Sequence, residues 1–209
     1  MSSSPEAEYE TITVHDEGTV LFAEILAPPM NLLGPELVRD LVSLIQRVET
    51  DDKAKVLVFK SGDPDYFISH VDVTRIKEYR AEAAKLTGEA SIALLFRYLS
   101  ASRFVTIAQI EGRVRAAGSE FALACDMRFA ARESAIFGQF EPAFGQVPGG
   151  GAAQHLTFVP LRAPGPPRNG CSARPSARPR PCRRWPPGGR PTRRRSARRQ
   201  TVARCWRCA

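Results

Sequence analysis

An abrupt change of composition near residue 160 restricts which part of the chain can fold. Residues 160–209 contain 15 Arg and 10 Pro but no Lys, Asp or Glu. The remaining 15 Lys and Arg against 22 Asp and Glu leave residues 1–159 with a net charge of −7, although the whole chain carries +8. An Arg- and Pro-rich segment without aliphatic periodicity buries too little apolar surface to offset its conformational entropy. We therefore expect one domain over residues 1–159 and a disordered basic tail over residues 160–209.

The order of apolar and amphipathic segments before residue 160 predicts an α/β domain. The apolar segments Thr11–His15 and Thr19–Leu26 flank Asp16-Glu17-Gly18, which predicts a hairpin. Leucines at helical spacing after Pro35 predict a helix over Pro35–Glu49. Strands and helices then alternate, and the expected segments are the strands Val56–Phe59, Phe104–Ile110 and Met127–Ala130 and the helices Thr74–Ala90, Ala90–Ser100 and Gly118–Cys125. This alternation is typical of an α/β domain with a largely buried sheet.

The composition also favours a cytoplasmic protein that does not contact membranes. No apolar run reaches the roughly 18–20 residues needed to span a bilayer. The polar, acidic N-terminus lacks the basic and apolar regions of a secretory signal. Cys125 is the single cysteine before residue 160, which fits a reducing compartment. Cys205 and Cys208 form one C-x-x-C pair, and zinc usually needs four ligands, so we predict no metal site.

Three segments together carry a family resemblance. The first is Asn31-Leu32-Leu33 before the predicted helix, and the second is Phe67–Asp72 after the strand Val56–Phe59. The third comprises Ala116–Asp126, Phe137–Glu141 and Val147–Gly151. Over residues 10–157 the chain resembles the enoyl-CoA hydratase/isomerase family of the crotonase superfamily, whereas the tail does not. The resemblance implies a truncated crotonase-like core, which winds as a ββα spiral.

The resemblance also implies an oxyanion hole that stabilises the enolate of an acyl-CoA thioester. Negative charge builds on the thioester oxygen when the α-proton leaves or when water adds to the neighbouring double bond. Each fixed hydrogen-bond donor aimed at that oxygen is worth about 10²–10³ in rate. By position, the donors are the backbone N–H groups of Ser69 and Ala117. Ala117 falls at the start of a predicted helix, where N–H groups lack intrahelical partners and the dipole favours an anion.

Two carboxylates supply the acid–base chemistry in this resemblance. Glu120 and Glu141 match the paired glutamates that hydratases use to hold a water, deprotonate it and protonate the α-carbon. Positioned groups of this kind contribute about 10²–10⁴ in rate. The pair favours hydration of a 2-enoyl-CoA, with isomerisation or another enolate-forming reaction as the alternative enzymatic function. Coenzyme A belongs to the substrate, and no further cofactor is expected.

The family pattern assigns substrate binding to His70, Val71, Asp72 and Gly118. His70 replaces the usual Gly, and Ala116-Ala117 replaces Gly-Gly. Because Gly is favoured where φ is positive or where the backbone approaches a ligand, we expect a narrower or re-aimed hole. His70 can alternatively lie at the pocket rim, and Asp72 can cap the following helix.

The tail leaves further hypotheses open. Relatives continue with helices that complete the CoA pocket and help to build trimers or hexamers. The Arg/Pro/Ala/Cys/Gly composition after residue 159 is typical of GC-rich DNA translated in the wrong frame, which indicates a frameshifted or otherwise altered C-terminus. We then expect an incomplete pocket and impaired homo-oligomers. The non-enzymatic alternatives are an inactive product and an interaction protein whose tail binds nucleic acid nonspecifically through phosphate neutralisation.

Overall fold

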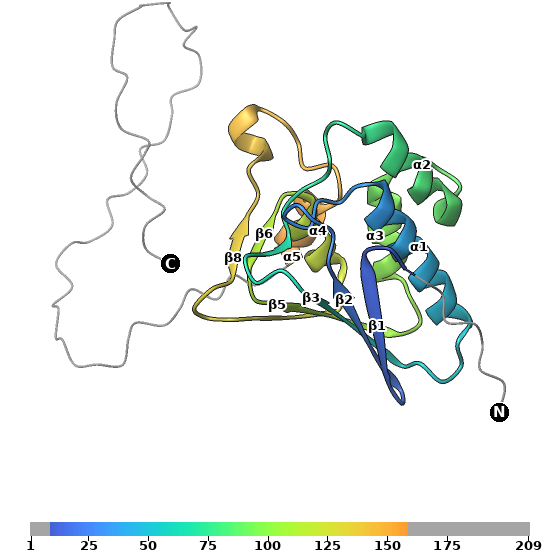
Figure 1. Ribbon diagram of the computed structural model, residues 1–209. Coiled ribbons are helices and arrows are strands. Elements are labelled where there is room, and N and C mark those ends of the chain that lie inside the picture. The colour runs from blue at the N-terminus through green and yellow to red at the C-terminus, as the bar shows by residue number, and fades with distance from the viewer. Residues whose placement is uncertain (1–8, 159–209) are drawn as a thin grey trace, which may run out of the picture. The chain divides into compact units, whose positions relative to one another are not determined.

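The computed structural model describes residues 9–158, which contain two β-sheets (Figure 1). The larger sheet has the order β1 (Ile12–Glu17), β2 (Val20–Ile25), β3 (Val56–Ser61), β5 (Val105–Ile110) and β7 (Met127–Ala130). The smaller sheet has the order β4 (Tyr66–Ile68), β6 (Arg113–Arg115) and β8 (Ile136–Gly138). The predicted hairpin β1–β2 is antiparallel, and the other pairings are parallel. The predictions for residues 160–209 lie outside the described residues.

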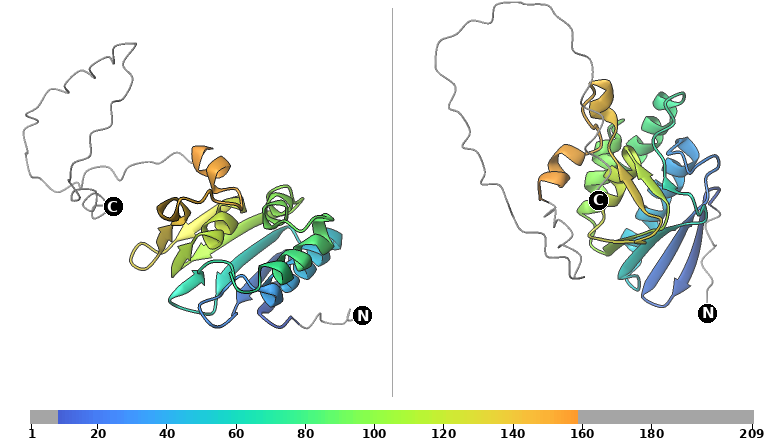
Figure 2. Two further views of the ribbon diagram at one scale, coloured as in Figure 1. Left: turned by 90° about the horizontal axis from the view of Figure 1, so that it is seen from above. Right: turned by 90° about the vertical axis from the view of Figure 1, so that its left-hand side faces the viewer.

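Helices follow the strands in chain order. They are α1 (Pro35–Thr50), α2 (Ile76–Thr87), α3 (Ile92–Ser100), α4 (Ala117–Ala124), the 3-10 helix η1 (Glu141–Phe144) and α5 (Ala152–Phe158). Pro35 occupies the first turn of α1, where its missing N–H costs nothing. Gly88 ends α2 in the left-handed region at φ 78°, a conformation that suits glycine. Figures 1 and 2 show α1, α2 and α3 on one side of the larger sheet.

The chain winds as a repeated ββα unit. It passes through a strand of the larger sheet, then a strand of the smaller sheet, and then helices: β3–β4–α2–α3, β5–β6–α4 and β7–β8–η1–α5. This topology confirms the predicted α/β class and the ββα spiral. The smaller sheet was not predicted as a sheet, because strands of three residues are too short to display an alternating pattern.

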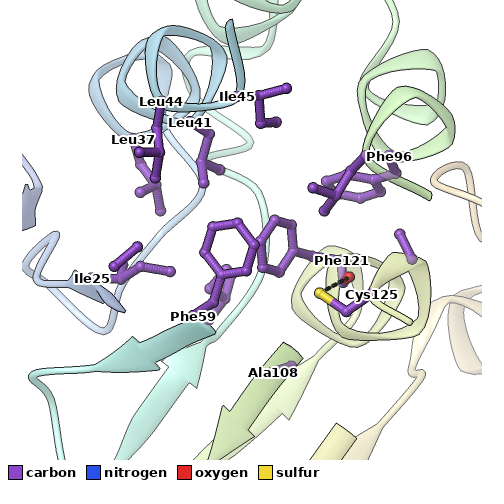
Figure 3. Close-up of a cluster of buried hydrophobic side chains, with 14 of the residues drawn as sticks. Ile25, Leu37, Leu41, Leu44, Ile45, Phe59, Phe96, Ala108, Phe121 and Cys125 are labelled. Atoms are coloured by element: carbon purple, nitrogen blue, oxygen red, sulfur yellow. Dashed lines mark hydrogen bonds between the residues drawn. The ribbon is translucent and has the colours of Figure 1, made fainter. Parts of the chain in front are cut away.

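Aromatic side chains form the centre of the core (Figure 3). The rings of Phe59 on β3 and Phe121 on α4 meet edge to face with centroids 4.9 Å apart. Phe96 of α3 packs on Phe121 from another side at 5.8 Å. Cys125 is buried beside this cluster, and burial raises the pKa of its thiol to about 12. Cys125 is therefore a core residue rather than a nucleophile.

Asn31 holds the ends of three strands together. Its side-chain Oδ1 accepts the Ala27 N–H at 2.7 Å, and its Nδ2 donates to Ser61 Oγ at 2.8 Å and to the Phe67 carbonyl at 3.1 Å. The residue is fully buried and has φ 48°, a region that Asn tolerates better than most residues. These bonds join the end of β2, the end of β3 and the strand β4. Asn31, in the first of the three segments that carry the family resemblance, thus has a structural role.

Candidate active site

A cavity of about 330 Å³ brings together residues from α2, α3, α4, η1 and the glycine-rich loop Val147–Gly151. Four residues predicted for the site line it: Val71, Ala117, Glu120 and Glu141. The remaining walls were not predicted and come from Tyr79, Arg80, Ser91, Ile92, Ala116, Gln146, Val147, Gly149 and Gly150. The two glutamates are 21 residues apart in the sequence, yet they face one space.

Glu120 is a buried carboxylate held by the glycine-rich loop. It lies on α4 with 2% of its surface exposed, and its Oε1 accepts the N–H groups of Gly150 at 2.7 Å and Ala152 at 3.1 Å. Burial raises the pKa of Glu120, the nearby charge of Glu141 raises it further, and the backbone hydrogen bonds oppose the shift. A Cβ at Gly150 would overlap the Glu120 carboxylate, which explains the need for glycine in the loop.

Glu141 begins η1 and is half-buried. Its Oε2 atom is buried without a hydrogen-bond partner among the described residues. An unpaired buried carboxylate oxygen is costly, and this oxygen is out of contact with solvent although Glu141 lines the cavity. Glu120 and Glu141 thus differ in surroundings, since Oε1 of Glu120 is bonded to backbone N–H groups and Oε2 of Glu141 has no partner among the described residues.

The start of α4 contains a strained residue. Ala116 has φ 46° and ψ −120°, a conformation that residues with a Cβ rarely adopt. Two hydrogen bonds hold it there: its N–H donates to the Gly138 carbonyl at 2.8 Å, and its carbonyl accepts the Glu120 N–H at 3.0 Å. Ala117 follows as the first residue of the helix, where an N–H has no intrahelical partner. The positive φ is the reason why glycine is expected at position 116.

Ser69 follows β4 and is buried, with 2% of its surface exposed. Its neighbour Ile68 contacts α4. The backbone of Gly118 lies so close to the Ile68 carbonyl that a Cβ added at Gly118 would overlap it. Ser69 and Ala117 therefore belong to two segments in direct contact, although Ser69 does not line the cavity described above. Their shared role as an oxyanion hole stays a prediction, and so does substrate binding by Gly118, whose described role is close packing.

His70 and Asp72 lie outside the cavity that contains the glutamates. The His70 Nδ1 is 2.6 Å from the Val71 carbonyl, and its ring meets Phe140 edge to face at 6.2 Å. Asp72 Oδ1 accepts the Thr74 N–H at 2.9 Å and closes the turn before α2, but Arg75 is the N-cap of α2 and no side chain bonds to the cap, so the capping alternative is wrong. Their contacts with a substrate stay predictions.

The described residues also contain no group of three or more His, Cys, Asp or Glu side chains arranged to hold a metal ion. The predicted absence of metals and further cofactors is not tested by this finding and stays a prediction. Among the same residues no helix is long and apolar enough to cross a membrane.

The chain belongs to the enoyl-CoA hydratase/isomerase family, whose model matches residues 15–159. A solved structure of a provisionally assigned enoyl-CoA hydratase from Streptomyces avermitilis is 56% identical, with a TM-score of 0.71 over 74% of this chain. The mouse mitochondrial enoyl-CoA hydratase domain-containing protein 2 is 29% identical over 73% of this chain. The fatty acid oxidation complex subunit alpha of Idiomarina loihiensis is 31% identical over 70% of it. These likenesses confirm the resemblance inferred from the motifs.

The chain spans about half the length of several of these relatives. It covers 56% of the Streptomyces chain, 51% of the mouse protein and 21% of the Idiomarina subunit. The activity and assembly of the whole relatives are therefore matters for proposal here. The mouse relative is named as mitochondrial, so the predicted cytoplasmic location stays a prediction.

Proposed function

We propose that this protein hydrates a 2-enoyl-CoA thioester. The observation that carries the proposal is the pair of carboxylates, Glu120 and Glu141, facing one cavity beside the first residue of α4. A family member needs one group to activate water and one to protonate carbon, and two carboxylates in different surroundings can divide these tasks. Isomerisation of the double bond needs no bound water, so it does not require a second carboxylate to activate one.

The proposed mechanism assigns a role to each group. Water is held between the two carboxylates that line the cavity, loses a proton to the pair, and its oxygen bonds to the β-carbon. The π electrons move to the thioester oxygen, where the N–H groups of Ala117 and Ser69 stabilise the charge. Glu120, whose raised pKa favours holding a proton, returns one to the α-carbon. The sum is addition of one water across the double bond.

The apolar wall of the cavity supports this chemistry. Val71, Ile92 and Val147 line it together with the glutamates. Val71 and Ile92 are half-buried, whereas Val147 is 81% exposed. They offer contact surface to an acyl chain. The cavity therefore combines a binding surface with the acid–base pair.

The test is a hydratase assay on the full chain and its variants Glu120→Gln and Glu141→Gln. Each substitution keeps shape and removes the ionisable group, so each should lower the hydration rate by about 10² or more. Glu133→Gln is the matched control, because Glu133 is exposed and outside the cavity. Circular dichroism verifies that the variants fold.

The product distinguishes the alternatives. Hydration gives a 3-hydroxyacyl-CoA, whereas isomerisation gives an acyl-CoA with a shifted double bond. The proposal is wrong if the parent chain produces only the shifted double bond, or if both glutamine variants hydrate crotonyl-CoA at the parent rate.

A further inference from the structure

Among the described residues that line the cavity with the two glutamates, Arg80 is the single cation. It lies on α2, one position after the buried Tyr79, which lines the same cavity. The position of these two residues depends on how α2 lies against α1 and α3. Neither belongs to a motif of the sequence, so the family pattern assigns them no role.

Arg80 is exposed, and its guanidinium is oriented but has no acidic partner among the described residues. Its Nε donates to the Ala90 carbonyl at 2.5 Å, and this bond fixes the orientation of the guanidinium group. No salt bridge between described side chains includes Arg80. Arg75, the residue just before the same helix, differs because it is bound to both Glu36 and Glu78. The two terminal nitrogens of Arg80 therefore remain available to an anion, and a planar fork of donors suits a carboxylate.

We propose that Arg80 binds a carboxylate at the far end of the acyl group, so that the substrate is the CoA monothioester of an unsaturated dicarboxylic acid. This inference rests on the proposed function and names its substrate class. A second carboxylate in this cavity would be repelled by Glu120 and Glu141 unless a cation offset that repulsion. Arg80 supplies the one cation on the wall.

The phosphates of coenzyme A are the other anions that a cation near the site could meet. The pantetheine arm separates these phosphates from the thioester, whereas Arg80 lines the same space as the acid–base pair. An acyl carboxylate is therefore the better occupant. The two candidate anions predict different results. Every CoA thioester carries the phosphates, whereas only a dicarboxylic acyl group carries the additional carboxylate.

The experiment compares binding of glutaryl-CoA and butyryl-CoA to the full chain by isothermal titration calorimetry. Both probes are saturated and unreactive, so binding is measured without turnover. The parent should bind glutaryl-CoA more tightly. Arg80→Met should weaken glutaryl-CoA binding about tenfold, as expected for one charge-assisted hydrogen bond near solvent, and leave butyryl-CoA within about twofold. Arg80→Lys should restore part of the loss.

Lys77→Met is the matched control, because Lys77 lies on the same helix, is exposed and does not line the cavity. It should change neither affinity. Equal weakening of both thioesters by Arg80→Met would assign Arg80 to the CoA phosphates and overturn the inference, as would no change in either. If the parent binds neither thioester, the proposed function fails, and the substrate class fails with it.

Discussion

At the scale of single residues, Ala116 shows how a side chain can conflict with the backbone that the site requires. It has a φ of 46° and directly precedes Ala117, the first residue of α4 and part of the cavity lining, and its own hydrogen bonds to Gly138 and Glu120 hold that conformation. A residue with a Cβ in such a region stores about 1–3 kcal/mol of strain, which the surrounding packing must offset. Glycine would adopt the same conformation without this cost.

We therefore predict that Ala116→Gly stabilises the fold by about 1 kcal/mol, after allowing for the extra entropy that glycine adds to the unfolded chain. Ala81→Gly, at an exposed position of α2, is the control and should destabilise by about 1 kcal/mol. Urea unfolding measures both. Equal destabilisation by the two substitutions would show that position 116 is not strained.

At the scale of elements, α4 is the short helix around which the candidate site is built. All eight of its residues are buried. Gly118 lets its backbone contact the Ile68 carbonyl, and Glu120 bonds it to the loop before α5. The helix is therefore held by long-range contacts rather than by its own helical propensity, which is weak for so few residues.

Gly118→Ala should destabilise the domain by about 3 kcal/mol, because the added Cβ would overlap the Ile68 carbonyl and force α4 away from β4. Gly149→Ala is the control, since a Cβ there meets no atom within 4 Å. It should change the free energy of unfolding by less than about 1 kcal/mol. Chemical denaturation compares the two, and a Gly118→Ala protein as stable as the control would contradict the packing argument.

At the scale of the whole molecule, apolar side chains are exposed on two edge strands. Among the strands of residues 9–158, β7 and β8 each pair on one side only. Met127 and Phe129 on β7 are 40% and 60% exposed, and Ile136 and Phe137 on β8 are 52% and 49% exposed. Parallel sheets usually have both faces covered by other elements. Exposed apolar side chains on an unpaired edge strand therefore favour association with another chain.

We predict concentration-dependent association of the full chain rather than a stable trimer, as measured by size-exclusion chromatography with light scattering. Phe129→Lys should reduce it, because the charge opposes edge-to-edge contact. Phe144→Lys is the control, since Phe144 is 74% exposed but lies on η1. A well-behaved trimer with normal turnover would contradict both this prediction and the hypothesis of an altered C-terminus.

The sequence by itself determined the features that neighbouring residues encode. The hairpin, α1 and the strands of the larger sheet follow from local periodicity, and all were predicted close to their observed bounds. The motifs also indicated Glu120 and Glu141 as a pair. The reason is that residue type and spacing suffice for a helix, a long strand or a family pattern.

Only the tertiary structure decided what surrounds those residues. Gly150 bonds to Glu120 from 30 positions away, and Arg80 enters the same cavity from another helix. The smaller sheet and the strain at Ala116 likewise depend on how each ββα turn lies against the one before it. Contacts between distant segments are set by the winding of the whole chain, and no local pattern records them.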